Sequence, residues 1–159
     1  MSLAHQAVAE LSAAQEYFNR SSRNLTDGHS AFAPVEGMMT ATQQIAHAAQ
    51  TIEWFIQGAF RPEGFDLDFE KHFADVAACP SVTDARAWFN RAIEAAKAMT
   101  ASRSDAELLA PLPDGPIMGG LPRFAVYGAI TDHTAHHRGA LTVYSRLNGV
   151  VPPMPYGEM

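Results

Sequence analysis

Residues 122–149 read PRFAVYGAITDHTAHHRGALTVYSRLNG, and this stretch does more than any other to determine the fold. Its apolar residues recur with the spacing of one helix face. They are Val126, Ile130, Leu141 and Tyr144. Pro122 suits the first turn of a helix, and Asn148-Gly149 is a typical C-terminal stop. We therefore predict a helix from about Pro122 to Leu147.

Three stretches upstream have the same helical spacing of apolar residues. They run from about Ala4 to Leu25, from Met38 to Phe60 and from Thr83 to Ser102. Their apolar faces consist of Val8, Leu11, Ala14, Phe18 and Leu25 in the first, Ile45, Ala49, Ile52, Ile56 and Ala59 in the second, and Ala85, Trp88, Phe89, Ala92, Ala96 and Met99 in the third. Glycine and proline punctuate the connections, and we expect a short helix around residues 69–76 in the second of them.

No run of alternating β-branched residues indicates a strand, so the chain is predicted to be all-α. Four amphipathic helices of this length bury their apolar faces against one another as a four-helix bundle. We expect one domain, residues 1–159, with long connections and an extended, proline-rich C-terminal tail. The second and third connections are long enough to join neighbouring helices or to cross over the bundle.

Composition argues against several functional classes. The chain has 159 residues, a formal net charge of −6 and 11 Lys and Arg residues without a basic cluster, so we expect no nucleic-acid binding. No apolar run approaches the ~20 residues of a membrane-spanning helix, and the N-terminus has no signal-peptide pattern. The only cysteine, Cys79, allows no intrachain disulfide. A cytoplasmic protein without a membrane partner is the simplest expectation.

Two of the seven histidines lie four residues apart in the predicted last helix. His133 and His137 therefore share one helix face, and that face is otherwise apolar. This spacing allows two imidazoles to bind one metal ion, as in helical zinc motifs. Such pairs also occur by chance on exposed helices, where they bind nothing. His136, three residues after His133, is a competing ligand, a pocket residue or a plain surface residue.

A third ligand has to come from another helix, and His47, in the middle of the predicted second helix, is the best candidate. Its face also carries Gln43, Gln44, Thr51 and Trp54, so taken alone His47 is more often a solvated histidine than a ligand. The remaining three histidines, which lie in connections or near the N-terminus, are expected at the surface: His5, His29 and His72.

Two segments together resemble a known family. Residues 133–149, HTAHHRGALTVYSRLNG, followed by Pro152-Pro153, are similar to the C-terminal signature of the DinB-like (DinB/YfiT) superfamily of DNA-damage-inducible helical bundles. Residues 45–47, IAH, followed by residues 52–55, IEWF, resemble the second-helix motif of that family. The resemblance covers nearly the whole chain in length and helix order. One departure is Ala140, where many relatives have Gln, and this difference can alter the pocket wall.

The resemblance implies a four-helix bundle with one metal ion on three histidines, which map onto His47, His133 and His137. It implies a metal-dependent enzyme that acts on a small-molecule substrate. The family includes thiol S-transferases that use low-molecular-weight thiols and a mycothiol-dependent isomerase, while many members have no known reaction. The alternative is a metal-binding or stress-response protein without turnover.

Three neutral imidazoles leave positions on the ion open for water or substrate, and Zn²⁺, Ni²⁺, Fe²⁺, Co²⁺ and Mn²⁺ are all admissible. Activation of water would support hydrolysis, and deprotonation of a thiol would support S-transfer. No catalytic acid or base is evident. Glu53 is expected to be a solvated carboxylate. Arg138 could bind a substrate carboxylate, although a surface salt bridge is the more common role. Trp54 and Tyr144 could line the pocket, although aromatic residues at helical spacing more often lie in the core. A homodimer is expected from the base rate for soluble proteins.

Overall fold

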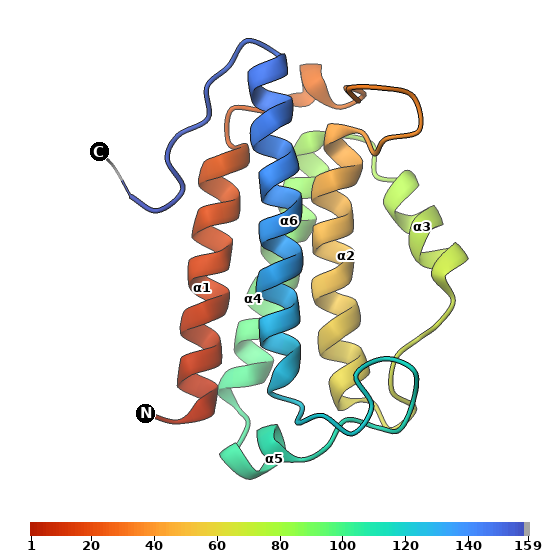
Figure 1. Cartoon of the computed structure of the whole chain (residues 1–159), viewed down its shortest axis with the longest axis vertical. Helices are drawn as coiled ribbons and strands as arrows, with labels where there is room; N and C mark the ends of the chain where they lie inside the picture. The colour runs from red at the N-terminus through yellow and green to blue at the C-terminus, as the bar shows by residue number, and fades with distance from the viewer. Residues whose placement is uncertain (158–159) are drawn as a thin grey trace.

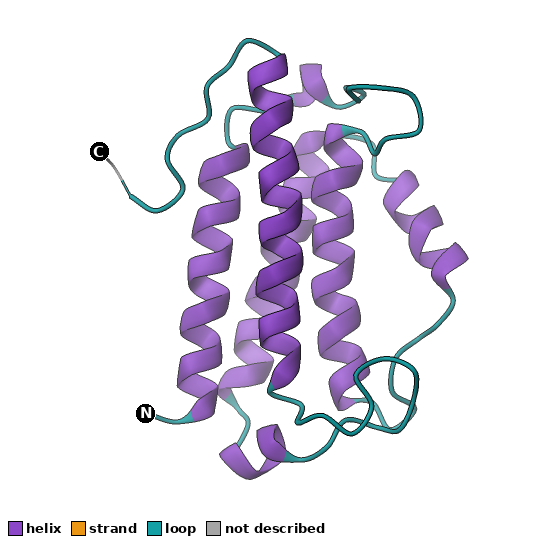
Figure 2. Cartoon of the chain, in the orientation of Figure 1, coloured by secondary structure: helices purple, strands orange, loops and turns teal. Residues whose placement is uncertain are grey.

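The computed structural model describes residues 1–157, in which four long helices lie side by side with roughly parallel axes (Figure 1). These helices are α1 (Leu3–Ser22), α2 (Ala41–Phe60), α4 (Val82–Ala101) and α6 (Ala125–Leu147). Three short helices lie in the connections: η1 (Asp27–His29), α3 (Phe69–Ala77) and α5 (Asp105–Leu109). The described residues contain no strand, only an isolated bridge between Pro111 and Pro122 (Figure 2). The prediction of an all-α four-helix bundle is confirmed.

The order of the helices places the two histidine-bearing helices side by side. Both α1 and α2 contact α4 and α6, so α1 and α2 lie on opposite corners of the bundle. α1 and α6 run in one direction, and α2 and α4 run in the other (Figure 1). The parallel α2–α4 pair requires a crossover, in which α3 carries the chain back along the outside of α2. α2 and α6 are therefore antiparallel neighbours, with α3 beside them.

The ends of the long helices are set by hydrogen bonds that periodicity does not reveal. The Thr40 hydroxyl accepts the Gln43 N–H and the Gln43 side chain accepts the Thr40 N–H, so α2 begins three residues later than predicted. α6 also begins three residues late, because the N–H groups of Arg123 and Phe124 donate to carbonyls at the α5 segment. α1 ends at Ser22, three residues before the predicted end.

The predicted apolar faces meet between the four long helices and form the core. Phe18 on α1 stacks on Phe89 on α4, with ring centroids 4.1 Å apart. Ile52 on α2 and Leu141 on α6 are 1% and 0% exposed, so all four helices contribute fully buried side chains. Members at the edge of the stripes, such as Val8, are only half buried. The helix stripes read from the sequence therefore identify the core.

The C-terminal segment follows α6 without regular secondary structure. Gly149 has a φ of 77°, a left-handed conformation that suits glycine and ends the helix. The tail then lies against the end of α1 and the residues that follow it, where Arg20 and Asn24 donate side-chain hydrogen bonds to the carbonyls of Met154 and Val151. Among residues 1–157, no helix combines the length and apolarity that a bilayer crossing requires.

Candidate metal centre

The three histidines predicted as ligands meet at the α2–α6 contact. The ring centroids of His133 and His137 are 4.5 Å apart, and each lies 5.0 Å from that of His47. Each ring offers a nitrogen within 4.8 Å of the others. Because zinc–nitrogen bonds are ~2.1 Å long, small side-chain rotations would place all three nitrogens on one ion. No other group of three potential ligands lies this close together in the described part of the chain.

A buried hydrogen-bond chain fixes the orientation of the His137 ring. The Tyr144 hydroxyl donates to the Met39 carbonyl at 2.8 Å and accepts from the Gln44 Nε2 amide at 3.3 Å. The Gln44 carbonyl oxygen is thereby turned toward His137 Nδ1. Since that oxygen can only accept, Nδ1 carries the proton, and a neutral His137 then has its lone pair on Nε2.

The lone pair on His137 Nε2 points into the histidine cluster. His133 Nε2 lies 3.2 Å from it, so two ring nitrogens converge on the same small region. The Nδ1 atoms of His47 and His133 are buried and have no hydrogen-bond partner. Buried imidazole nitrogens without partners are costly, and a cation is a natural partner for converging lone pairs. The donor set therefore fits a divalent transition-metal ion.

Electrostatics also favour the neutral, ligand-competent form of these rings. Burial lowers the pKa of His137 to about 3 and that of His133 to about 4, with further lowering by the neighbouring histidines. The pKa of His47 is lowered as well, first by burial and then by His136. Neutral histidine is the form that binds metals, so the three rings need no deprotonation at neutral pH.

A cavity of about 190 Å³ opens beside His47 and His133. The remaining lining residues come from α2 and α3: Gln50, Thr51, Trp54, Phe55, Phe69, His72 and Phe73. Of the two places expected for Trp54, the core and the pocket wall, the structure supports the pocket wall, because Trp54 lines this cavity. His72 is half buried in the same wall rather than at the open surface, because its ring packs beside Phe69 and its Nε2 lies 3.3 Å from the Asp66 carbonyl.

Sequence reasoning missed Gln44 and several residues of the cavity wall, among them His72, Phe69 and Phe73. A glutamine three residues before a candidate ligand was a usable signal for Gln44, because it lies on nearly the same face of α2 as His47. No comparable signal was available for His72, since the crossover that brings α3 against α2 cannot be read from local periodicity. Tyr144, predicted in the core, is 1% exposed and supports Gln44 from there.

Three other predicted side chains lie outside the cavity. His136 is exposed, with its ring centroid 5.1 Å from that of His137, so its place is the surface beside the cluster. Glu53 is half buried and faces α4, where Arg91 lies near it; burial raises the pKa of its carboxyl, so this carboxylate is less solvated than predicted. Ala140 is half buried, packs against the core and does not line the cavity.

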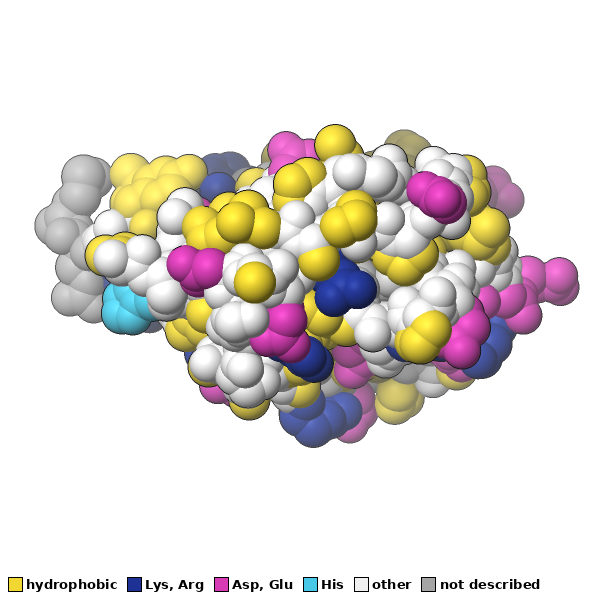
Figure 3. Space-filling model, turned by 90° about the horizontal axis from the view of Figure 1, so that it is seen from below, with side chains coloured by type: hydrophobic (Ala, Val, Ile, Leu, Met, Phe, Trp, Pro, Cys, Tyr) yellow, Lys and Arg dark blue, Asp and Glu magenta, His cyan; other side chains and the backbone are white. Residues whose placement is uncertain are grey.

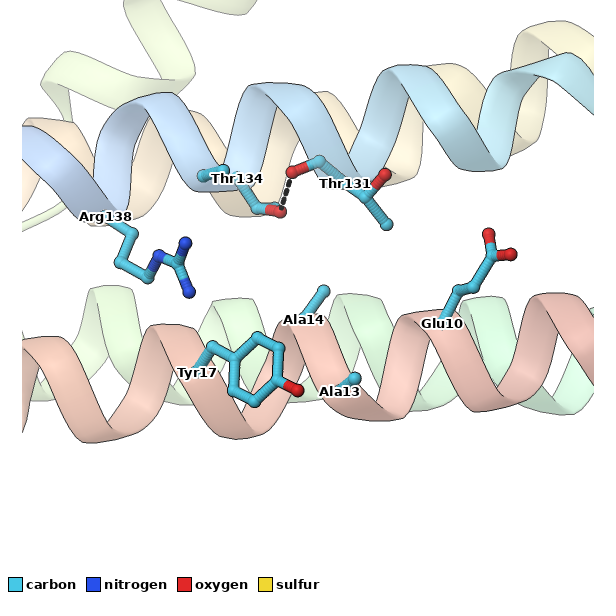
Figure 4. A pocket seen from close by; sticks show the side chains of 8 residues that line it. Glu10, Ala13, Ala14, Tyr17, Thr131, Thr134 and Arg138 are labelled. Carbon is cyan, nitrogen blue, oxygen red and sulfur yellow. Dashed lines mark hydrogen bonds between the residues drawn. The ribbon is translucent and has the colours of Figure 1, made fainter. Parts of the chain in front are cut away.

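The opposite face of α6 forms a second, separate cleft of about 290 Å³ against α1 (Figure 4). Glu10 and Tyr17 line it from α1, and Thr131, Thr134 and Arg138 line it from α6. The Arg138 guanidinium lies 5.6 Å from the Tyr17 ring centroid and forms no salt bridge among residues 1–157, so the predicted ion pair is wrong. Arg138 therefore faces away from the histidine cluster.

Comparisons with known proteins agree on the fold. The sequence profile of the DinB superfamily matches residues 10–141. The structure is similar to that of a DinB-like protein, YjoA, from Bacillus subtilis, with a TM-score of 0.70 and 17% identity over 97% of this chain and 99% of the other. It is also similar to a DinB-like protein from Bacillus cereus, with a TM-score of 0.67 and 19% identity over 91% of this chain and 89% of the other.

A third similar structure is that of YfiT from Bacillus subtilis, which is described as a probable metal-dependent hydrolase with an unusual four-helix bundle topology. Its TM-score is 0.70, and it is 15% identical over 92% of this chain and 88% of the other. At these identities the three solved structures establish a shared fold. No curated protein matches the chain.

Proposed function

Because the chain belongs to the DinB superfamily, we propose that it is a metal-dependent enzyme that hydrolyses a small molecule at His47, His133 and His137. One observation carries the proposal: three neutral imidazoles converge at a contact between two helices, and two of them line a cavity that a substrate can enter. The description of YfiT as a probable metal-dependent hydrolase supports the same reaction class.

The ligands, the residue that orients them and the cavity wall would each have a separate role in the reaction. His47, His133 and His137 would hold the ion, which when bound supplies Lewis-acid polarisation and lowers the pKa of a water or thiol. Gln44 would keep His137 in the tautomer whose Nε2 faces the cluster. Thr51 and Gln50 would offer hydrogen bonds to the substrate, and the aromatic wall would exclude water from the reacting group.

Zn²⁺, Ni²⁺, Fe²⁺, Co²⁺ and Mn²⁺ all accept imidazole nitrogen, so we propose a site for one divalent transition-metal ion of this group. S-transfer from a low-molecular-weight thiol is the second candidate, since the same ion could bind a thiolate. The cavity contains no Lys or Arg among its lining residues to recognise the carboxylates that many such thiols carry. Hydrolysis is therefore the better-supported reaction. We also propose a homodimer, on the base rate for such proteins.

Metal reconstitution combined with two reaction assays tests this function. Zn²⁺, Ni²⁺ and Mn²⁺ are added separately to metal-free protein, and release of 4-nitrophenol from 4-nitrophenyl acetate is followed beside thiol consumption with an electrophile. We expect metal-dependent ester hydrolysis that His133→Ala abolishes and His136→Ala retains. Stoichiometric metal binding without turnover in either assay would favour the non-catalytic metal-binding alternative. Metal-dependent thiol consumption alone would favour S-transfer.

A further inference from the structure

The cavity beside the histidine cluster has a chemical character of its own, because four aromatic side chains line it. They are Trp54, Phe55, Phe69 and Phe73. From this lining we infer that the substrate is an uncharged molecule with one aromatic ring, or an apolar group of that size, next to the group that reacts. The inference rests on the metal-dependent function proposed above and specifies its substrate class.

The aromatic wall presents carbon rather than polar atoms to the cavity. The Trp54 indole N–H donates to the Asp66 carbonyl at 2.7 Å, so its one polar group is already satisfied. The Trp54 ring also packs against Phe55 and Phe69, with centroids 5.1 and 6.1 Å away. Phe73 lies over the His47 ring at 6.1 Å with an interplanar angle of 29°. A bound ring would therefore meet faces and edges at the separations that aromatic pairs prefer.

The same lining disfavours a charged ligand. No Asp, Glu, Lys or Arg is among the described residues that line the cavity. Apart from the reacting group, which would face the ion, a charged group of the substrate would lose its hydration there without gaining a charged side chain as counterion, which is unfavourable. Beyond the candidate ligands, the polar lining residues are His72, Thr51 and Gln50, and the last two are 7% and 9% exposed. These groups can orient an uncharged polar function such as a carbonyl or an amide.

The volume of the cavity suits one aromatic ring. The cavity measures about 190 Å³, whereas an engineered apolar cavity of about 150 Å³ is large enough to bind benzene. One six-membered ring with a few further atoms therefore fits the available space. Phe69 and Phe73 on α3 are 46% and 54% exposed, so the outer wall borders solvent and a substrate can reach the cavity from that side.

The first experiment tests the cavity without any metal. Binding of benzyl alcohol and of benzoate to metal-free protein is measured by nuclear magnetic resonance titration. We expect benzyl alcohol to bind at least about tenfold more tightly than benzoate, because the carboxylate would be desolvated. Phe69→Ala should weaken benzyl alcohol binding by about three- to tenfold, as expected for the loss of an aromatic pair.

Leu67→Ala is the matched control, because Leu67 is 47% exposed in the same connection and does not line the cavity. It should leave the binding of benzyl alcohol unchanged. Benzoate binding as tight as benzyl alcohol binding would overturn the inference, as would unchanged binding of benzyl alcohol to the Phe69→Ala variant.

The second experiment adds the ion and uses hydroxamates, which chelate metals, as probes. Calorimetry on zinc-loaded protein should show benzohydroxamate binding at least about tenfold more tightly than acetohydroxamate. Equal affinities for the two would overturn the substrate class but would support an open metal site. Binding of benzyl alcohol without binding of any hydroxamate would overturn the proposed function and support the cavity assignment.

Discussion

His137 is the side chain on which the candidate site depends most, because it connects the α6 cluster to the buried Gln44 on α2. Its Nε2 lies 3.2 Å from His133 Nε2, and the residue is only 5% exposed. Replacing His133 or His137 by Ala should abolish stoichiometric metal, measured by elemental analysis after dialysis. His136→Ala should retain the metal, because its exposed ring lies outside the cluster. Loss of metal from His136→Ala alone would show that the ligand pair is misassigned.

Gln44 should influence metal affinity without contacting the ion. Gln44→Met removes the carbonyl that accepts from His137 Nδ1, so the ring is no longer held in one tautomer and one orientation. We therefore expect the metal dissociation constant to rise about 10–100-fold. Competition with a chelator measures this constant. Gln44→Glu retains an acceptor for Nδ1–H and should restore most of the affinity. Gln57→Met, at an exposed position on α2, is the control and should have no effect. Unchanged affinity in Gln44→Met would contradict a positioning role.

Acidification should destabilise the metal-free protein through the buried histidines. The pKa values of His137 and His133 are about 3 and about 4 when folded, but ~6.5 when unfolded. The unfolded chain therefore binds more protons below pH ~6.5, and stability falls as the pH is lowered from there to about 3. Urea unfolding at several pH values should show this loss. His137→Gln should show a smaller loss, and an identical pH dependence in the two proteins would rule out this contribution.

At the scale of the helices, stability depends on the interior faces of α1 and α4. Phe89 on α4 is 0% exposed and stacks on Phe18, so Phe89→Ala leaves a cavity as well as losing apolar burial. We expect a loss of ~3–5 kcal/mol in the free energy of unfolding, measured by denaturant titration. Val143→Ala on α6, 53% exposed, should change this free energy by less than ~0.5 kcal/mol. Similar losses in the two variants would mean that the core is misassigned.

The whole molecule has an acidic balance that bears on its partners. The net charge is −6, and the end of the bundle seen in Figure 3 mixes acidic, basic and apolar side chains. With this acidic balance and no cluster of Lys and Arg in the sequence, counterion release is not expected to drive tight binding to DNA. We expect no saturable binding of duplex DNA at physiological salt in a fluorescence anisotropy titration. Tight binding that weakens steeply with salt would contradict this, and light scattering on the same samples would test the proposed homodimer.

The sequence alone determined the helices and the shared face of His133 and His137. Both follow from local spacing, since a helix repeats every 3.6 residues wherever it lies in the chain. The stripes that contain Phe18, Ile52 and Leu141 identified the core for the same reason. His47 became a candidate ligand mainly through the family resemblance, because its own helix face reads as polar and solvated.

Only the tertiary structure decided which residues surround the histidines. Gln44 and His137 are 93 positions apart, and no local pattern encodes a contact between them. The crossover that runs α2 and α4 parallel also brings α3 beside α2, which moves His72 and Phe69 into the cavity wall. The choice between neighbouring and crossover connections depends on how the apolar faces of all four helices pack together. That packing is a property of the assembled bundle, and therefore the cavity and its chemistry are too.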